Sequence, residues 1–255
     1  VGWIYPATMK IDIDIPEKTS IRAKFWCGNW KYGAHRHLIA SYLAGRFDSN
    51  EINLSWIYSS SPSMLKNNLW FNLKKLKKWE NPILNGAQKL DLLAPQTMGV
   101  KMKRALDITE QAPDLHTNTN PKSYYDESFC AIVNETRFAQ ATGLLTEKIM
   151  MPMLNCKPFI MVGPPGNLEY MKRWGFETFS DYWDESYDKE EQHDKRLAKI
   201  LGLIDWIGSK SIEELQDLYE RMLPTLMFNQ VRILDLQEQL LAEPITKNIL
   251  FKRLG

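Results

Sequence analysis

Two short apolar segments in the second half of the chain constrain its fold more than any other feature. They are "SFCAIVNE" at 128–135 and "PFIMV" at 158–162, and each gives way to polar or turn-forming residues. Continuous apolar runs of this length are typical of strands buried on both faces of a parallel sheet. A helix is predicted between them from Thr146, and a second helix at 167–174 is expected to end at Gly175. This alternation predicts an α/β fold with a Rossmann-like parallel sheet.

The first half of the chain shows the same alternation. Strands are predicted at 24–30 and 52–58, and the intervening residues 34–47 carry apolar side chains at helical spacing. The segment "MKIDIDIP" alternates isoleucine with aspartate, which predicts a short strand with one solvated face. Its Asp12 and Asp14 also match the DxD pattern of metal-dependent glycosyltransferases, so both interpretations remain open at this point.

A lysine-rich segment at 62–79 is predicted to form one helix, with leucines along one side at positions 65, 69, 73 and 76. The segment also carries Trp70 and Trp79. Such a surface can bind a nucleic acid or an anionic glycan, and a solvated helix face is the alternative. Its lysines are Lys66, Lys74, Lys75, Lys77 and Lys78.

The last 45 residues are predicted to be helical. Ser211 and Glu214 form a capping-box pattern, and Pro224 is expected to divide the run into two helices. The predicted organisation therefore has three parts. They are an N-terminal α/β part at 1–125, a second α/β part at 126–208 and C-terminal helices at 209–255 that pack on the rest.

Composition excludes several classes of protein. The 255 residues carry a formal net charge of +1, so the chain as a whole does not attract nucleic acids or membranes. No apolar run is long enough to span a membrane, and no signal-peptide pattern is found. Three widely spaced cysteines favour a reducing cytoplasm. The histidines do not show metal-ligand spacing, and no glycine-rich phosphate loop occurs, so no metal or cofactor is predicted.

Polar residues that follow the predicted buried strands are the candidate binding residues. In open α/β sheets, ligands bind beyond the carboxyl ends of the strands, where Glu135 and the triplet Thr146-Glu147-Lys148 are expected to lie. A helix N-terminus binds phosphate through its free backbone N–H groups, and Lys148 would add a positive charge. Glu147 can accept hydrogen bonds from ribose hydroxyls. The pattern predicts a nucleoside-diphosphate site; the alternative is a capping threonine followed by a surface Glu–Lys pair.

The segments "SFCAIVNETRF" and "LLTEKIMMPMLNCKPFIMVGPPG" resemble the nucleotide-sugar-binding core of the α1,3-fucosyltransferases. The upstream segment "KFWCGNWKYGAHRHLIASYLAG" is similar to the part of that family in which a phosphate-binding arginine opens a helix. A closer likeness, which includes "GPPGNLEYMKRWGFETF" and "DESYD", is to fucosyltransferase-like proteins of tailed phages of marine bacteria. The shared motifs cover roughly residues 24–40 and 128–207.

The resemblance implies a two-lobed (GT-B) glycosyltransferase that uses a nucleotide-diphosphate sugar, with a GDP-sugar favoured, and that requires no metal. By position, it implies that Arg36 binds phosphate, that Glu147 contacts the ribose and that Lys148 contacts the diphosphate. The catalytic candidates are Glu135 and His35. The substrate-binding candidates are Asn29, Arg36, Thr146, Glu147, Lys148, Gly163, Asp184 and Tyr187.

Four points stay open at the level of sequence. The chain reads Asn-Glu-Thr at 134–136 where the α1,3-fucosyltransferases have Glu-Asn-Ser, so the carboxylate is shifted by one position. The carboxylates at 181–188 can bind a cation or an acceptor sugar, or cap a turn. The acceptor is expected to be a glycan or modified DNA, with nucleic acid held by the Lys66–Lys78 helix. The alternative function is a non-catalytic phage protein that keeps the fold and binds glycan, nucleic acid or a partner protein.

Overall fold

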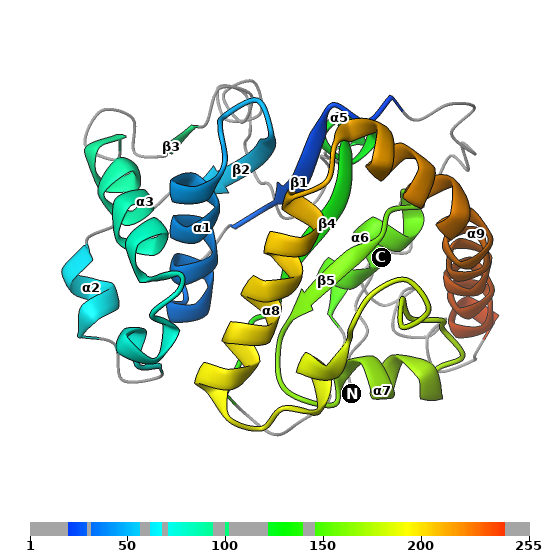
Figure 1. Cartoon of the computed structure of the whole chain (residues 1–255). Helices are drawn as coiled ribbons and strands as arrows, with labels where there is room; N and C mark the ends of the chain where they lie inside the picture. The colour runs from blue at the N-terminus through cyan, green and yellow to red at the C-terminus, as the bar shows by residue number, and fades with distance from the viewer. Residues whose placement is uncertain are drawn as a thin grey trace, which may run out of the picture.

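The computed structural model shows a five-stranded sheet at the centre of the chain (Figure 1). Four strands are parallel and follow the order β2-β1-β4-β5, and the short β3 pairs antiparallel with the outer side of β2. The strands are β1 (Ala23–Cys27), β2 (Ile52–Trp56), β3 (Val100–Lys101), β4 (Ser128–Asn134) and β5 (Phe159–Val162). The structure describes residues 20–29, 32–56, 62–67, 71–93, 100–101, 122–139 and 146–242.

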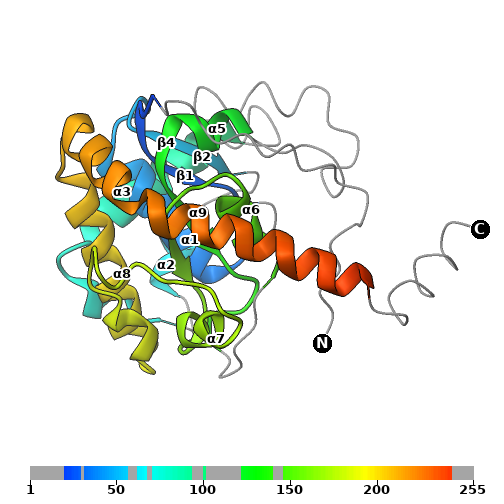
Figure 2. The same ribbon diagram turned by 90° about the vertical axis from the view of Figure 1, so that its right-hand side faces the viewer.

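Helices cover both faces of this sheet (Figure 2). The β1–α1–β2 and β4–α6–β5 connections run in opposite directions along the sheet, so right-handed crossovers place α1 and α6 on opposite faces. The α-helices are α1 (Ala34–Arg46), α2 (Pro62–Lys66), α3 (Glu80–Leu93), α5 (Lys122–Glu127), α6 (Glu147–Leu154), α7 (Asn167–Arg173), α8 (His193–Gly208) and α9 (Ile212–Ala242). Two 3₁₀ turns are η1 (Leu73–Leu76) and η3 (Ser186–Lys189).

The parallel strands are buried as their composition predicts. Every residue of β2, β4 and β5 is buried, and β1 has one half-buried residue, Lys24. The prediction of an α/β fold with a parallel sheet is therefore confirmed. The predicted parts 1–125 and 126–208 each contribute strands to this one sheet, because β1 pairs with β4. None of the helices that the structure describes has both the length and the apolar character that a membrane-spanning helix needs.

The prediction of one helix over 62–79 is wrong. The helix α2 ends at Lys66, and a separate 3₁₀ turn, η1, follows after Asn72. Asn72 is extended, and its side-chain oxygen accepts a hydrogen bond from the Lys74 N–H, a local contact that competes with a continuous helix. The helix α3, which begins only at Glu80, was not predicted.

The prediction that Pro224 divides the C-terminal helices is also wrong, because α9 runs from Ile212 to Ala242 without a break. Proline has no N–H group, so the carbonyl group of Glu220, four residues earlier, loses its intrahelical hydrogen bond. Glu220 is exposed, so water can bond that carbonyl group and the helix can continue. The capping box is confirmed, since the Ser211 N–H donates to Glu214 Oε2 (2.7 Å) and the Glu214 N–H donates to Ser211 Oγ (3.2 Å). The predicted strand at 9–16 lies outside the described residues.

Two glycines allow α1 and α3 to pack closely against each other. A Cβ atom at Gly86 of α3 would collide with the Ser41 carbonyl oxygen of α1, and one at Gly45 would collide with the Pro82 carbonyl oxygen. The two helix backbones are therefore in contact at this crossing. This contact fixes α1, whose first turn carries His35 and Arg36, against the rest of the fold.

We expect Gly86→Ala to lower the free energy of unfolding by about 1–3 kcal/mol, because the helices must separate to admit one methyl group. Gly202→Ala in α8 is the matched control, since its Cβ would meet nothing within 4 Å. There, the better helix propensity of alanine should leave stability unchanged or raise it by up to about 1 kcal/mol. Urea denaturation measures both values. Equal stability of the two variants would contradict the close crossing.

Candidate functional site

The order of the parallel strands reverses at β1 and β4. From β1 the chain continues to β2 on one side, whereas β4 and β5 lie on the other side. At such a reversal the connections diverge to opposite faces, and ligands of open α/β proteins bind outside the carboxyl ends of the strands. The residues at the carboxyl ends of β1 and β4 therefore form the candidate site, which we call the strand-end site.

Asparagine side chains tie the ends of the central strands together. Asn134 Nδ2 donates to Asn29 Oδ1 (3.0 Å) and lies 3.3 Å from Cys27 Sγ. The Asn29 backbone N–H donates to Ser55 Oγ at the end of β2 (3.0 Å). Asn29 and Asn134 are both buried. Asn29 lies two residues past the end of β1, and its contacts join the ends of β1, β2 and β4.

Glu135, Thr146 and Lys148 lie together at this edge. The Thr146 hydroxyl donates to the Glu135 carboxylate, whose two oxygens lie 2.8 and 3.0 Å away. Lys148 Nζ contacts the hydroxyls of Thr136 (3.2 Å) and Thr146 (3.3 Å). An ammonium group, a carboxylate and two hydroxyls therefore gather at the start of α6.

Thr146 is the N-cap of α6, because its side chain accepts a hydrogen bond from the Lys148 N–H (3.4 Å). A capping threonine is what the sequence offered as the alternative to a diphosphate site. Glu147 is the first residue of α6, and its side chain lies outside what the structure describes. The helix has only eight residues and includes Pro152.

His35, in the first turn of α1, faces the end of β4. Its Nε2 lies 2.8 Å from the Glu135 carbonyl oxygen. A carbonyl can only accept, so Nε2 carries the proton and Nδ1 holds a lone pair. Burial lowers the pKa of His35 to about 4, and the charges of Arg36 and Arg196 act in the same direction. The imidazole is therefore neutral near pH 7.

Arg36 follows His35 and is buried near the end of β1. Burial raises the pKa of the Cys27 thiol to about 12, while the contacts with Asn29 and Asn134 and the charge of Arg36 oppose that rise. The guanidinium is thus close enough to act on the β1 terminus and on His35. Arg36 follows His35, His35 contacts the Glu135 carbonyl, and the Glu135 carboxylate contacts Thr146, which Lys148 also contacts. Arg36 and Lys148 therefore lie at the same edge of the sheet.

Gly163, directly after β5, packs beside Glu135. A Cβ atom at Gly163 would lie 2.7 Å from Asn167 Nδ2 and 3.3 Å from Glu135 Cβ. A larger residue here would require the Asn167 side chain to move. Gly163 therefore belongs to the strand-end site as a position where the backbone approaches Glu135 closely.

Asp184 is part of a turn, whereas Tyr187 contacts β5 one residue before its end. The exposed Asp184 carboxylate accepts from the Ser186 N–H (2.8 Å) and hydroxyl (2.9 Å). Tyr187 is buried, and its hydroxyl accepts from the Met161 N–H (3.4 Å). The neighbouring Asp188 caps α7 by accepting from the N–H groups of residues 168 and 169 (3.0 and 3.2 Å). The described contacts of this segment are those of a capped turn, and no group of three potential metal-binding side chains occurs among the described residues.

Sequence reasoning missed Arg196 and Phe138 beside the site. The buried Arg196 guanidinium donates to the Phe138 carbonyl (2.6 Å) and lies over the Phe138 ring at 4.3 Å. That ring in turn stacks on His35 with centroids 5.3 Å apart. Arg196 belongs to α8, far along the chain, so no local pattern connects it with His35.

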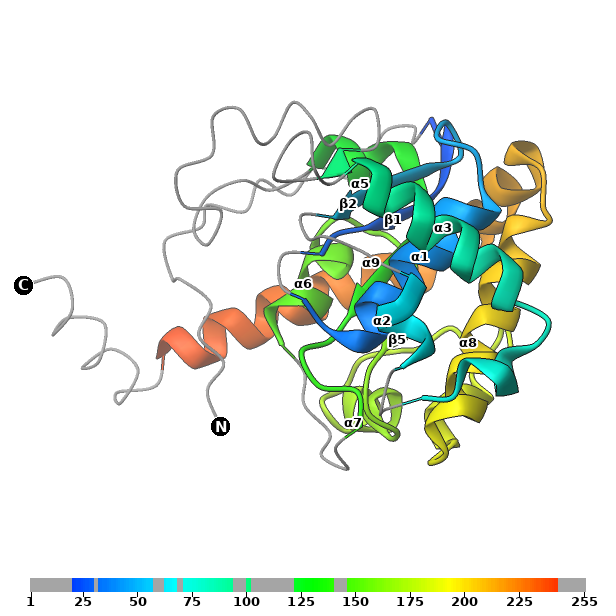
Figure 3. The same cartoon turned by 90° about the vertical axis from the view of Figure 1, so that its left-hand side faces the viewer.

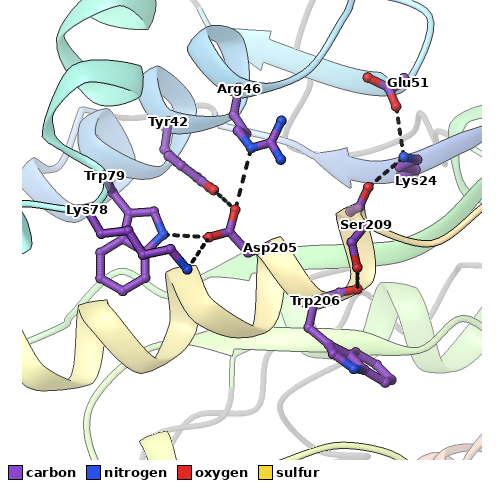
Figure 4. A network of polar contacts seen from close by, with 10 residues as sticks. Lys24, Tyr42, Arg46, Glu51, Lys78, Trp79, Asp205, Trp206 and Ser209 are labelled. Atoms are coloured by element: carbon purple, nitrogen blue, oxygen red, sulfur yellow. Dashed lines mark hydrogen bonds and ion pairs between the residues drawn. The ribbon is translucent and has the colours of Figure 1, made fainter.

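A cavity of about 330 Å³ lies at the other end of α1, beside Asp205 of α8 (Figure 4). The Asp205 carboxylate accepts hydrogen bonds from the Tyr42 hydroxyl and from Trp79 Nε1 (2.8 Å). Lys78 Nζ and Arg46 Nε lie 3.2 and 3.6 Å from its oxygens. Four donors surround this one carboxylate. We interpret the Asp205 network as a structural tie between α1, α8 and the segment before α3.

We expect the free energy of unfolding to fall as the pH is lowered from 6.5 towards 4. Burial lowers the pKa of both His35 and His37 to about 4 from an ordinary 6.5, so the unfolded chain binds more protons in this range. Each histidine contributes at most about 1.4 kcal/mol per pH unit. Urea denaturation at a series of pH values measures the slope. His35→Asn should reduce the slope of the free energy of unfolding against pH, whatever its effect on stability at pH 7. An unchanged slope would contradict the lowered pKa of His35.

Comparisons with models of known protein families, with curated proteins and with solved structures found no match to this chain.

Proposed function

We propose that the chain is a glycosyltransferase that takes its sugar from a nucleoside-diphosphate sugar, with a GDP-sugar favoured. The donor diphosphate would bind at the strand-end site. The observation that carries the proposal is the position of Lys148, whose ammonium lies at the start of α6 between two threonine hydroxyls and beside Glu135. Arg36, Glu135 and Lys148, which stand in the segments that resemble the α1,3-fucosyltransferases, come from three elements that end or begin near this edge of the sheet, which supports the same proposal.

Lys148 would hold the diphosphate in this scheme. The ammonium contacts two hydroxyl groups, and a phosphate oxygen would be a stronger, charge-assisted acceptor for it than a hydroxyl is. Arg36 would supply a second positive charge from the other side of the β1–β4 junction. Glu147 would contact the ribose from the first position of α6. Metal is not required, because two cationic side chains oppose the charge that a metal ion would otherwise neutralise.

In the proposed reaction an acceptor hydroxyl attacks the anomeric carbon of the sugar. A carbon–oxygen bond to the acceptor forms, the bond to the diphosphate breaks, and the hydroxyl proton passes to a base. Glu135 and His35 are the two candidates for that base. His35 presents a lone pair on Nδ1, whereas the Glu135 carboxylate is engaged by the Thr146 hydroxyl. Preorganised positive charge then stabilises the departing diphosphate.

The proposal places this sheet in the donor-binding lobe of a two-lobed transferase. The acceptor would be a glycan or modified DNA. The rival interpretation, a non-catalytic protein that binds nucleic acid through the lysine-rich segment, has less support. Two of those lysines are paired with α8, because Lys75 Nζ lies 3.0 Å from Asp194 and Lys78 Nζ lies 3.2 Å from Asp205.

We expect Lys148→Ala to lower the transfer rate by about 10²–10³, or about 2.7–4 kcal/mol, because one preorganised charge contact with the leaving group is lost. It should also reduce the rise in melting temperature that the donor produces. Thermal-shift screening against GDP-, UDP-, CMP- and dTDP-linked sugars first identifies the donor, since a ligand that binds only the folded state stabilises it.

Lys172→Ala is the matched control, because Lys172 is an exposed lysine in the last turn of α7. It should leave the rate and the donor-induced shift unchanged. If Lys148→Ala behaves like this control, the diphosphate does not bind at α6. Polynucleotide binding that weakens steeply with salt, in the absence of any nucleotide-sugar binding, would favour the non-catalytic alternative.

A further inference from the structure

The helix α9 carries a row of exposed apolar side chains. Met227, Phe228 and Val231 are 39%, 47% and 57% exposed, although large apolar residues usually lie in the core. All three belong to the middle of α9, whose C-terminal part extends from the body of the molecule (Figures 2 and 3). Contiguous exposed apolar groups of this kind mark interaction surfaces.

The opposite side of α9 is fixed to the body of the protein. Asn229 Oδ1 accepts from the Glu177 N–H (2.8 Å), and Asn229 Nδ2 donates to the Glu177 carbonyl (2.9 Å). Gln230 Nε2 donates to the Leu154 carbonyl at the end of α6 (2.8 Å). These buried contacts set the rotation of α9 about its axis. The apolar row therefore faces away from the core of the chain that carries it.

The exposed residues on this side follow a heptad spacing. Asp217, Arg221, Pro224, Phe228, Val231 and Asp235 are all exposed and are separated alternately by four and three residues. Such a row forms one straight seam along a helix and is the pattern by which two helices pair. Its centre is apolar and its ends are charged. We call this row the α9 seam.

The charges at the ends of the seam specify what fits against it. Arg221 precedes Phe228 by seven positions, and Asp235 follows it by seven. An antiparallel copy of the same helix, centred on Phe228, would place each Arg221 opposite the Asp235 of the second copy. A parallel copy would place like charges opposite each other, which is unfavourable. Neither side chain forms an ion pair among the described residues, and both are exposed.

We propose that two copies of this chain associate through the α9 seam as an antiparallel helix pair with two-fold symmetry. Phe228 and Val231 pack at the centre, and two Arg221–Asp235 pairs close the ends. Such an interface is self-complementary, as two-fold symmetry requires. The apolar residues of the seam are Pro224, Phe228 and Val231, so the area that each copy buries is small compared with a standard interface of about 1,600 Å². We therefore expect the fraction of dimer to depend on protein concentration. The proposal is independent of the proposed transferase activity.

Sedimentation velocity of the full chain over a wide concentration range tests the association. The expected result is a monomer–dimer equilibrium that Phe228→Glu weakens at least tenfold, because it places two carboxylates at the centre of the seam. Phe228 is exposed, so the variant should keep the far-UV circular dichroism and urea midpoint of the parent. A chain that stays monomeric at all concentrations, or a dimer that Phe228→Glu leaves intact, would overturn the proposal.

A charge-reversal cycle tests the antiparallel arrangement. Arg221→Asp and Asp235→Arg should each weaken the dimer about threefold to tenfold, because exposed ion pairs are weak and two are lost together. The double variant restores opposite charges across the seam and should regain the parent affinity. Asp181→Arg changes the charge equally at an exposed site outside α9 and serves as the control. Failure of the double variant to recover, or an equal effect of the control, would exclude this pairing.

Discussion

The pairing of β1 with β4 is the interaction on which the rest of the structure depends. It joins segments about a hundred residues apart and brings Ala23 beside Ser128 and Phe25 beside Cys130. Both strands are almost wholly buried, so the pairing is stabilised by apolar burial as well as by the hydrogen-bond ladder. A side-chain hydrogen bond between Asn134, the last residue of β4, and Asn29, two residues past the end of β1, adds to it. Without this junction the sheet would have no reversal of strand order and no strand-end site.

Buried polar groups have different kinds of partners at the two ends of the sheet. At the amino end, four donors surround Asp205. Partial burial alone would raise the pKa of that carboxyl group, but the hydrogen bonds from Tyr42, Trp79 and Lys78 lower it below its usual value. At the carboxyl end, burial instead keeps His35 neutral, and Lys148 contacts two hydroxyl groups at the start of α6. The first arrangement is a satisfied tie between helices. The second leaves cationic and proton-accepting groups at the place where α/β proteins bind ligands.

The helix α9 packs on the body of the protein with one face and carries the proposed dimer interface on the other. Its inner face reaches the sheet layer, where the Tyr219 hydroxyl donates to the Cys156 carbonyl (3.0 Å) and its ring lies 4.7 Å from the buried Lys157 ammonium. Burial lowers the pKa of Lys157 to about 7, so this contact encloses a charge that water cannot solvate well. Because these contacts hold the inner face of α9 against the protein, the exposed apolar residues on its outer face do not pack against the described part of the same chain.

The features that could be predicted from the sequence are those that depend on residues near one another in the chain. These include the buried parallel strands, the helix α1, the start of α6 at Thr146 and the Ser211–Glu214 capping box, because the spacing of apolar residues and local hydrogen bonds encode them. Contacts between distant residues, such as His35 with Glu135 and Arg196 with Phe138, depend on the folded chain and could not be predicted. The tertiary structure also overrode local patterns: the leucine spacing of 62–79 gave way to Asn72, and α9 continues through Pro224. Local propensities differ by about a kilocalorie per mole, whereas long-range packing combines many contacts, so packing decides wherever the two disagree.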